Sequence, residues 1–227
     1  MKTMVISSVI TLLLAGGLLA QQPSDIRADM FAILNGDLER FERGMQGLEA
    51  MLAKNPGDPK LKVLHGNGIL ARAGEAFKKG DMQNAMKLWQ SSLDEMAQAV
   101  ELAPDDIFVR ARRGVVLISA SRSSSMPPMM SRPLTQSAVE DFEKVLQIRE
   151  KENTLVQSST HQRGELLTAL ADGWNRLGNP EKARTYFERV TRDLKGTIYE
   201  QKATAWLEGK SEAKAAEYFS CTGCHVE

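Results

Sequence analysis

The chain is poor in the residues that mark several large classes of protein. Its 227 residues include only two cysteines, three histidines and three tyrosines. The cysteines are Cys221 and Cys224, so a disulfide between them would close a very short loop and stabilise little of the fold. Tyrosines and runs of β-branched residues are scarce, whereas Ala, Leu, Glu, Lys, Arg and Met are frequent. That composition favours helices over strands.

The sequence also lacks an excess of either charge. Lys and Arg together number 29, as do Asp and Glu, so the composition implies no general attraction to nucleic acid or to an anionic membrane. No glycine-rich phosphate loop, Ser-His-Asp order or pair of catalytic carboxylates stands out in the chain. We therefore expect a protein that is not an enzyme and that does not bind nucleic acid.

A run of uncharged apolar residues lies at the N-terminus, from Val5 to Ala20, after a short positive start. The run is short for a bilayer span and ends in small residues, which is typical of a secretory signal peptide over residues 1–20. Cleavage after Gly17 is an alternative to cleavage after Ala20, because Leu18 is bulky for its place. An uncleaved membrane anchor is the other interpretation of this run. We expect an exported bacterial protein, periplasmic or extracytoplasmic, with no membrane span after cleavage.

Residues 24–219 read as a series of helices with apolar residues spaced by three and four. Asn or Asp caps and Gly or Pro residues separate the helices. An irregular segment is expected over 120–135. The expected helices are 25–34, 37–54, 59–79, 81–103, 107–119, 136–149, a helix opened by Ser159 that ends near 177, then 180–194, 197–208 and 211–219.

The helices repeat in pairs. Four residues of one pair, Ala171, Trp174, Ala183 and Phe187, recur 32 residues later as Ala203, Trp206, Ala215 and Phe219. A period near 34 residues that contains two antiparallel helices is typical of a helical solenoid. A non-solenoid helical bundle is the alternative, because short loops and apolar helix faces also describe a bundle.

The pattern resembles the tetratricopeptide repeat (TPR) family. Leu170, Ala171, Trp174, Gly178, Ala183 and Phe187 match its small and large residues at the helix crossing. Val190 replaces a usual small residue, and Lys195 stands where proline is common. The resemblance covers most of 24–219 and is specific in 164–195. It implies an all-α, right-handed superhelix of about four to five antiparallel helix pairs, with a concave groove that binds peptides or partner proteins.

The C-terminal segment 220–227 carries the strongest motif, Cys221-Thr222-Gly223-Cys224-His225. Two cysteines separated by two residues and followed by histidine have the spacing of c-type haem attachment. The motif resembles that of c-type cytochromes, with Cys221 and Cys224 as thioether sites and His225 as the proximal iron ligand. Only Val226 and Glu227 follow it, whereas a cytochrome c domain continues for dozens of residues. Because c-type haem is attached outside the cytoplasmic membrane, the motif and the leader support each other.

Three other interpretations of the cysteine pair remain open. An exported protein can oxidise it to a disulfide. A thioredoxin-like redox pair is disfavoured because no strand-helix-strand pattern surrounds it. A closed zinc site needs four ligands, and only three are local.

A second iron ligand would have to be a residue that precedes the motif in the chain. Met126, Met129 and Met130 lie in an expected loop from Ser121 to Pro133, within a stretch that has no acidic residue over 107–139. That stretch could cover a haem, bind an acidic partner, or be a solvated insertion with methionines as filler. Its arginines are Arg110, Arg112, Arg113, Arg122 and Arg132.

The topology of antiparallel pairs favours His161 over these methionines. Connections within pairs lie at one end of the stack and connections between pairs at the other. The methionine loop lies within a pair, whereas the tail follows a second helix and His161 precedes a first helix. His65 faces Leu61 and Leu64 and is expected in the core or the groove.

The sequence therefore predicts an exported TPR-like scaffold that carries one covalent haem c and acts in periplasmic electron transfer or haem-linked assembly. Its partners would be a protein in the groove and a redox partner. The alternative is a haem-free scaffold that binds a protein or peptide and has the cysteine pair as a disulfide.

Overall fold

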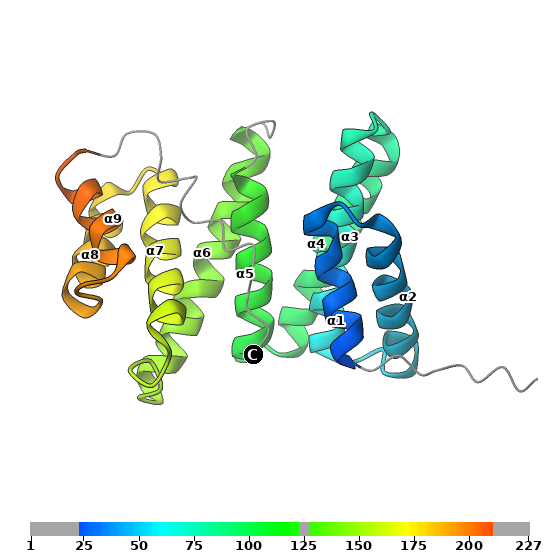
Figure 1. Cartoon of the computed structure of the whole chain (residues 1–227), viewed down its shortest axis with the longest axis horizontal. Helices are drawn as coiled ribbons and strands as arrows, with labels where there is room; N and C mark the ends of the chain where they lie inside the picture. The colour runs from blue at the N-terminus through cyan, green and yellow to red at the C-terminus, as the bar shows by residue number, and fades with distance from the viewer. Residues whose placement is uncertain (1–22, 123–127, 211–227) are drawn as a thin grey trace, which may run out of the picture.

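The computed structural model describes residues 23–122 and 128–210, and this part of the chain is helical without any strand. The helices stand side by side, with α8 and α9 at one end of the row and α2 at the other (Figure 1). The predicted all-α class is confirmed. The elements are α1 (Pro23–Phe31), the 3-10 helix η1 (Ala32–Asn35), α2 (Leu38–Lys54), α3 (Pro59–Lys78), α4 (Met82–Leu102), α5 (Ile107–Ser121), α6 (Pro128–Lys151), α7 (Thr160–Arg176), α8 (Pro180–Asp193) and α9 (Ile198–Leu207).

The helices pack most extensively within consecutive pairs. The pairs α1–α2, α3–α4, α5–α6 and α7–α8 are in contact, and α8 also contacts α9. Two further contacts join helices that are not consecutive, α3 with α5 and α7 with α9. The order of elements therefore sets the order of neighbours in space.

Short polar signals set the helix boundaries where the sequence places them. The side chains of Asp37, Asp58, Asp81, Asp106 and Asn179 each accept a hydrogen bond from a backbone N–H of the helix that follows. Ser159 and Gln162 form the predicted capping box at the start of α7. These caps supply acceptors to N–H groups that have no partner within the helix.

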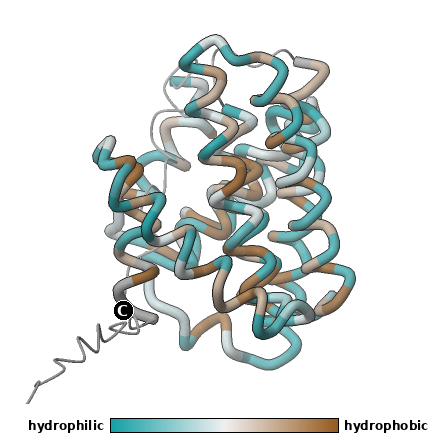
Figure 2. Tube along the Cα trace, turned by 90° about the vertical axis from the view of Figure 1, so that its right-hand side faces the viewer, coloured by the Kyte–Doolittle hydropathy of each residue, from teal (hydrophilic) through white to brown (hydrophobic). Residues whose placement is uncertain are grey.

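The core is built from the apolar stripes of the helices, and along each helix apolar and polar residues alternate in short stretches (Figure 2). One large cluster of buried residues extends from α3 to α9, and two smaller clusters join α1, α2 and α3. Trp89 and Phe187 are buried, and Phe187 stacks on Trp206 with ring centroids 4.4 Å apart. These aromatic residues therefore belong to the core or pack against it.

The irregular segment predicted over 120–135 is largely wrong. Helix α5 continues to Ser121, and α6 already begins at Pro128, so Met129 and Met130 are helical. A proline in the first turn of a helix loses no hydrogen bond, which explains the start at Pro128. Pro133, the expected last residue of a loop, lies inside α6. Leu134 and Ala138 are buried in the core, and their packing outweighs the cost of that proline.

Several predictions fall outside the described residues. These are the leader over 1–20, the last helix over 211–219, the haem tail over 220–227, and Met126. Among the described helices, none is both long and apolar enough to span a bilayer.

Candidate functional site

The residues of the predicted haem motif, Cys221, Cys224 and His225, lie outside the described part of the chain. Described residues include no group of three or more His, Cys, Asp or Glu side chains that could hold a metal ion by itself. In the sequence these residues follow α9, so the described side chains of interest are those of α9 and of the helices that contact it, α7 and α8.

His161 lies in the first turn of α7, and its imidazole contacts α9, the last described helix. Nδ1 of His161 is 2.7 Å from the hydroxyl oxygen of Tyr199 on α9. Tyr199 in turn donates to Oε1 of Glu165, one turn further along α7, at 2.8 Å. The His161 side chain is 44% exposed, so solvent reaches the ring while Nδ1 is held by the tyrosine. The chain thus places a histidine, a tyrosine and a carboxylate together between α7 and α9.

Gly164 makes this arrangement sterically feasible. The Tyr199 ring lies directly against the Gly164 backbone, and a Cβ atom there would overlap the ring. Because the ring lies flat on α7, its hydroxyl reaches both His161 and Glu165, which flank Gly164 along the helix. No role for Gly164 was predicted from the sequence. The sequence signal that was available is its position three residues after His161.

Three arginines of the stretch 107–139 are engaged in ion pairs inside the molecule. Arg110 and Arg113 both bind the carboxylate of Asp141, whose side chain is 0% exposed, at 2.6–2.9 Å. Arg122 binds Asp172 at 2.8 Å, and both side chains are nearly buried. These three arginines therefore already have acidic partners on α6 and α7, which counts against the stretch as a binding patch for an acidic partner at these residues.

Two methionines of the same stretch, Met129 and Met130, lie in the described part of the chain. Met129 is 81% exposed at the start of α6, whereas Met130 packs against the core. Met130 therefore fills space, as methionine often does in a core.

An apolar hollow lies between the N-terminal helices and α5. It measures about 500 Å³ and is lined by residues of α1, η1, α2, α3 and α5. Apart from Asn67, Arg112 and Ser119, the lining consists of apolar residues and Gly68. We call this hollow the apolar groove. Its size and lining are those of sites that hold small molecules or apolar side chains of a partner.

Asn67 gives the groove a polar point. Its Oδ1 atom is buried and has no hydrogen-bond partner among the described residues. A buried acceptor without a donor is costly, so such an atom calls for an explanation. A ligand that brings an N–H group into the groove would supply the missing donor.

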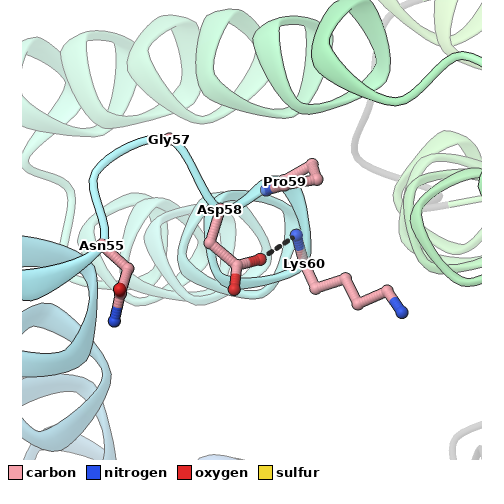
Figure 3. A pocket seen from close by; sticks show the side chains of 5 residues that line it. All are labelled: Asn55, Gly57, Asp58, Pro59 and Lys60. Atoms are coloured by element: carbon pink, nitrogen blue, oxygen red, sulfur yellow. Dashed lines mark hydrogen bonds between the residues drawn. The ribbon is translucent and has the colours of Figure 1, made fainter.

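A second hollow lies at the connection between α2 and α3, bordered by Asn55, Gly57, Asp58, Pro59 and Lys60 (Figure 3). Its carboxylate, Asp58, accepts from the backbone N–H groups of Lys60 and Leu61 at 2.8 and 3.2 Å. That group caps α3 and is not directed at a ligand.

His65 lies on α3 and does not line the groove. Its Nδ1 is 2.8 Å from a carboxylate oxygen of Glu95 on α4, and its Nε2 is 3.7 Å from Glu49 on α2. The ring therefore joins three helices through polar contacts, and its side chain is only 16% exposed, in keeping with the interior position expected for it.

One polar cluster joins α6, α7 and α8. Glu143 accepts from the Trp174 indole at 2.9 Å and from the Tyr186 hydroxyl at 3.3 Å. Burial, together with the charge of Glu143, raises the pKa of Tyr186 to about 12. The Lys182 ammonium lies 3.8 Å from the centre of the Trp174 ring. The cluster stabilises the helix junction and carries no sign of reactivity.

Comparison with known proteins does not assign the chain to a family. The chain matches no family model, no curated protein and no solved structure.

Proposed function

We propose that the protein is an exported helical-repeat scaffold that carries one covalently attached c-type haem on its C-terminal tail. It acts in electron transfer or in haem-linked protein assembly in the periplasm. The observation that carries this proposal is the spacing of Cys221, Cys224 and His225, supported by an apolar run over Val5 to Ala20 that has the pattern of a secretory leader.

The chemistry follows from these residues. Cys221 and Cys224 each add a thiol S–H across one vinyl group, so sulfur bonds one carbon and hydrogen the other, and no oxidant is consumed. His225 then supplies its imidazole to the iron from one face. Once bound, the haem supplies one-electron redox chemistry.

The scaffold is proposed to be TPR-like. The contacts of α3 with α5 and of α7 with α9 support this, because they join first helices of successive pairs. In a solenoid each repeat packs on its neighbour in this manner. The match of Trp174, Ala183 and Phe187 to the family pattern supports it independently.

The haem assignment is tested by expressing the full chain with its leader in a host that matures c-type cytochromes. After denaturation, haem absorbance is expected to remain with the polypeptide. The double variant Cys221→Ala/Cys224→Ala is the matched control and should yield a colourless chain of the same helicity. A colourless wild-type chain from a host that matures a reference cytochrome would refute the proposal.

The apolar groove favours a second function, binding of an apolar segment of a partner protein. The buried Oδ1 atom of Asn67 has no hydrogen-bond donor among the described residues. It therefore suits a peptide that has an N–H group among its apolar side chains.

Groove binding is tested with an apolar fluorescent probe and two matched tryptophan variants. Ala71→Trp places an indole in the groove, whereas Gln90→Trp places the same group on the exposed face of α4. Ala71→Trp should weaken probe binding at least tenfold, and Gln90→Trp should leave it unchanged. Equal binding by all three proteins would show that the groove is not the probe's site.

A further inference from the structure

Helices α3 and α5 line the apolar groove side by side and run in the same direction. The Lys60 ammonium at the start of α3 lies 3.5 Å from the carboxylate of Asp106, the N-cap of α5. Further along, Ala71 of α3 and Ala120 of α5 both line the groove. The lining residues of α3 extend from Leu61 to Ala71, so the helical rise gives the groove a length of about 15 Å, or about three helical turns.

The walls of the groove are apolar faces of helices. The lining residues include Leu61, Leu64, Gly68 and Ala71 on α3, and Ile26 and Met30 on α1, all spaced by three or four positions. Residues at this spacing are neighbours on the surface of one helix. The backbone groups behind these side chains are bonded within their own helices, so they offer nothing to a bound segment.

These walls distinguish an extended occupant from a helical one. An extended segment along the groove has about five residues, each with a backbone N–H and C=O that need partners. The described walls contain no strand edge, and their polar side chains are those of Asn67, Arg112 and Ser119. A helical segment bonds its backbone internally, so only its side chains meet the walls. The lining therefore fits an amphipathic helix.

Asn67 selects one side chain of such a helix. It lies on the same side of α3 as Leu64 and Ala71, near the middle of the groove. Its buried Oδ1 atom has no donor among the described residues, and the backbone N–H groups inside a helix are already used. Tryptophan combines one N–H donor with a large apolar ring. A tryptophan on the middle turn of the occupant therefore satisfies both the acceptor and the apolar walls.

Two cations lie at the end of the groove where α3 and α5 begin. The Lys60 ammonium is 5.9 Å and the Arg112 guanidinium 5.2 Å from the centre of the Phe108 ring, which lines the groove. The Lys60 side chain is 57% exposed, and Asp106 offsets part of its charge. An acidic residue at this end of the occupant is complementary to the Lys60 ammonium.

We propose that the apolar groove holds an amphipathic helix of a partner protein, with a tryptophan over Asn67 and an acidic residue at the end beside Lys60. The inference rests on the proposed binding of an apolar partner segment and adds the conformation and the anchor residues of that segment. Apolar residues three and four positions from the tryptophan would contact the walls.

The test uses the full chain and two fluorescein-labelled peptides, with binding followed by fluorescence anisotropy. The helical peptide has a central Trp, Leu residues three and four positions away, Glu in its first and last turns, and Ala, Gln and Lys elsewhere. The second peptide has one Ala beside the Trp replaced by Pro, which prevents a continuous helix. The helical peptide should bind at least tenfold more tightly. Equal affinities of the two peptides would overturn the helical occupant.

Substitutions in the protein test the two anchors. A peptide with Phe in place of Trp has no N–H and should bind more weakly to the wild type, and Asn67→Ala should abolish this difference. Lys60→Glu should weaken binding severalfold at low salt. Lys62→Glu is the matched control, because Lys62 contacts Gln98 of α4, and it should leave binding unchanged. A Trp preference that survives Asn67→Ala, or equal effects of the two lysine substitutions, would contradict the anchors.

The groove function and the helical occupant fail in different ways. If Ala71→Trp weakens binding of the apolar probe but the helical peptide has no advantage over its proline form, the groove stands and the helical occupant is overturned. Displacement of the probe by dodecanoate and by neither peptide would also overturn it and indicate a lipid-like ligand. If Ala71→Trp leaves probe binding unchanged, the groove function is overturned and the helical occupant with it.

Discussion

At the scale of single residues, the buried charges of this chain act in pairs supplied by distant segments. Asp141 is fully buried and neutralises Arg110 and Arg113, which come from a stretch without acidic residues. The charge pattern along the sequence suggested a basic patch, because an ion pair between residues about thirty positions apart leaves no local signal. Long-range pairing of this kind depends on helix packing and could not be inferred from α5 alone.

Removing the shared carboxylate should therefore be costly. Asp141→Ala leaves two arginines that are 17% and 14% exposed without their counter-ion, which should lower the free energy of unfolding by about 3–5 kcal/mol. Urea denaturation followed by circular dichroism measures this. Asp105→Ala is the control, because Asp105 is 73% exposed and its pair with Lys144 is solvated, so the midpoint should hardly move. Equal effects of the two substitutions would contradict the assignment.

The raised pKa of Tyr186 predicts that the free energy of unfolding depends on pH in the alkaline range. Its pKa is raised from 10.0 to about 12 in the folded protein, so folding favours the neutral phenol. The contribution of this group to stability is fully present below pH 10 and is lost as pH rises toward 12. Unfolding free energies of the wild type and Tyr186→Phe, measured from pH 8 to 11.5, should converge as pH rises. A constant difference between the two proteins over that range would contradict the prediction.

At the scale of elements, capping residues and apolar periodicity predicted most of the helices. The Asp caps and the box of Ser159 and Gln162 start helices where expected, because these signals act within a few residues of each other. The error lay at α6, where prolines, serines and methionines suggested a loop. Pro133 is accommodated in α6 because Leu134 and Ala138 anchor the helix in the core.

This explanation can be tested by comparing Pro133, which lies inside α6, with Pro59, which lies at the start of α3. Pro133→Ala should raise the free energy of unfolding by about 1–3 kcal/mol, because it restores a backbone donor inside α6 and removes a steric conflict. Pro59→Ala should give no such gain, since Pro59 is at the start of α3, where no intrahelical donor is needed. Thermal and urea unfolding of both variants measure the difference. A stabilised Pro59→Ala protein and an unchanged Pro133→Ala protein would be the opposite result.

The candidate site was predictable in parts at the same scale. The topology of paired helices favoured His161 over the methionines as a second iron ligand, and that role stays a prediction. The structure places His161 in contact with Tyr199 on α9, the last described helix. Tyr199, Glu165 and Gly164 were missed because their contact joins residues more than thirty positions apart. The apolar groove was missed for the same reason, since residues from five elements line it.

At the scale of the whole molecule, the chain combines a helical row with features at two separate places. The apolar groove lies among α1, α2, α3 and α5, and the sequence that follows α9 contains Cys221, Cys224 and His225. The proposed haem attachment and the proposed binding of an apolar partner segment therefore rest on different parts of the chain.

The intact mass of the mature protein tests the central claim most directly. The full-length chain is expressed in a bacterium that matures c-type cytochromes, recovered from the periplasm and weighed under denaturing conditions. The account predicts the mass of residues 21–227 plus one haem, and the mass of residues 18–227 plus one haem if cleavage follows Gly17. A periplasmic chain that carries no haem, with a mass two hydrogens below that of the free dithiol, would contradict the account and indicate a disulfide between Cys221 and Cys224.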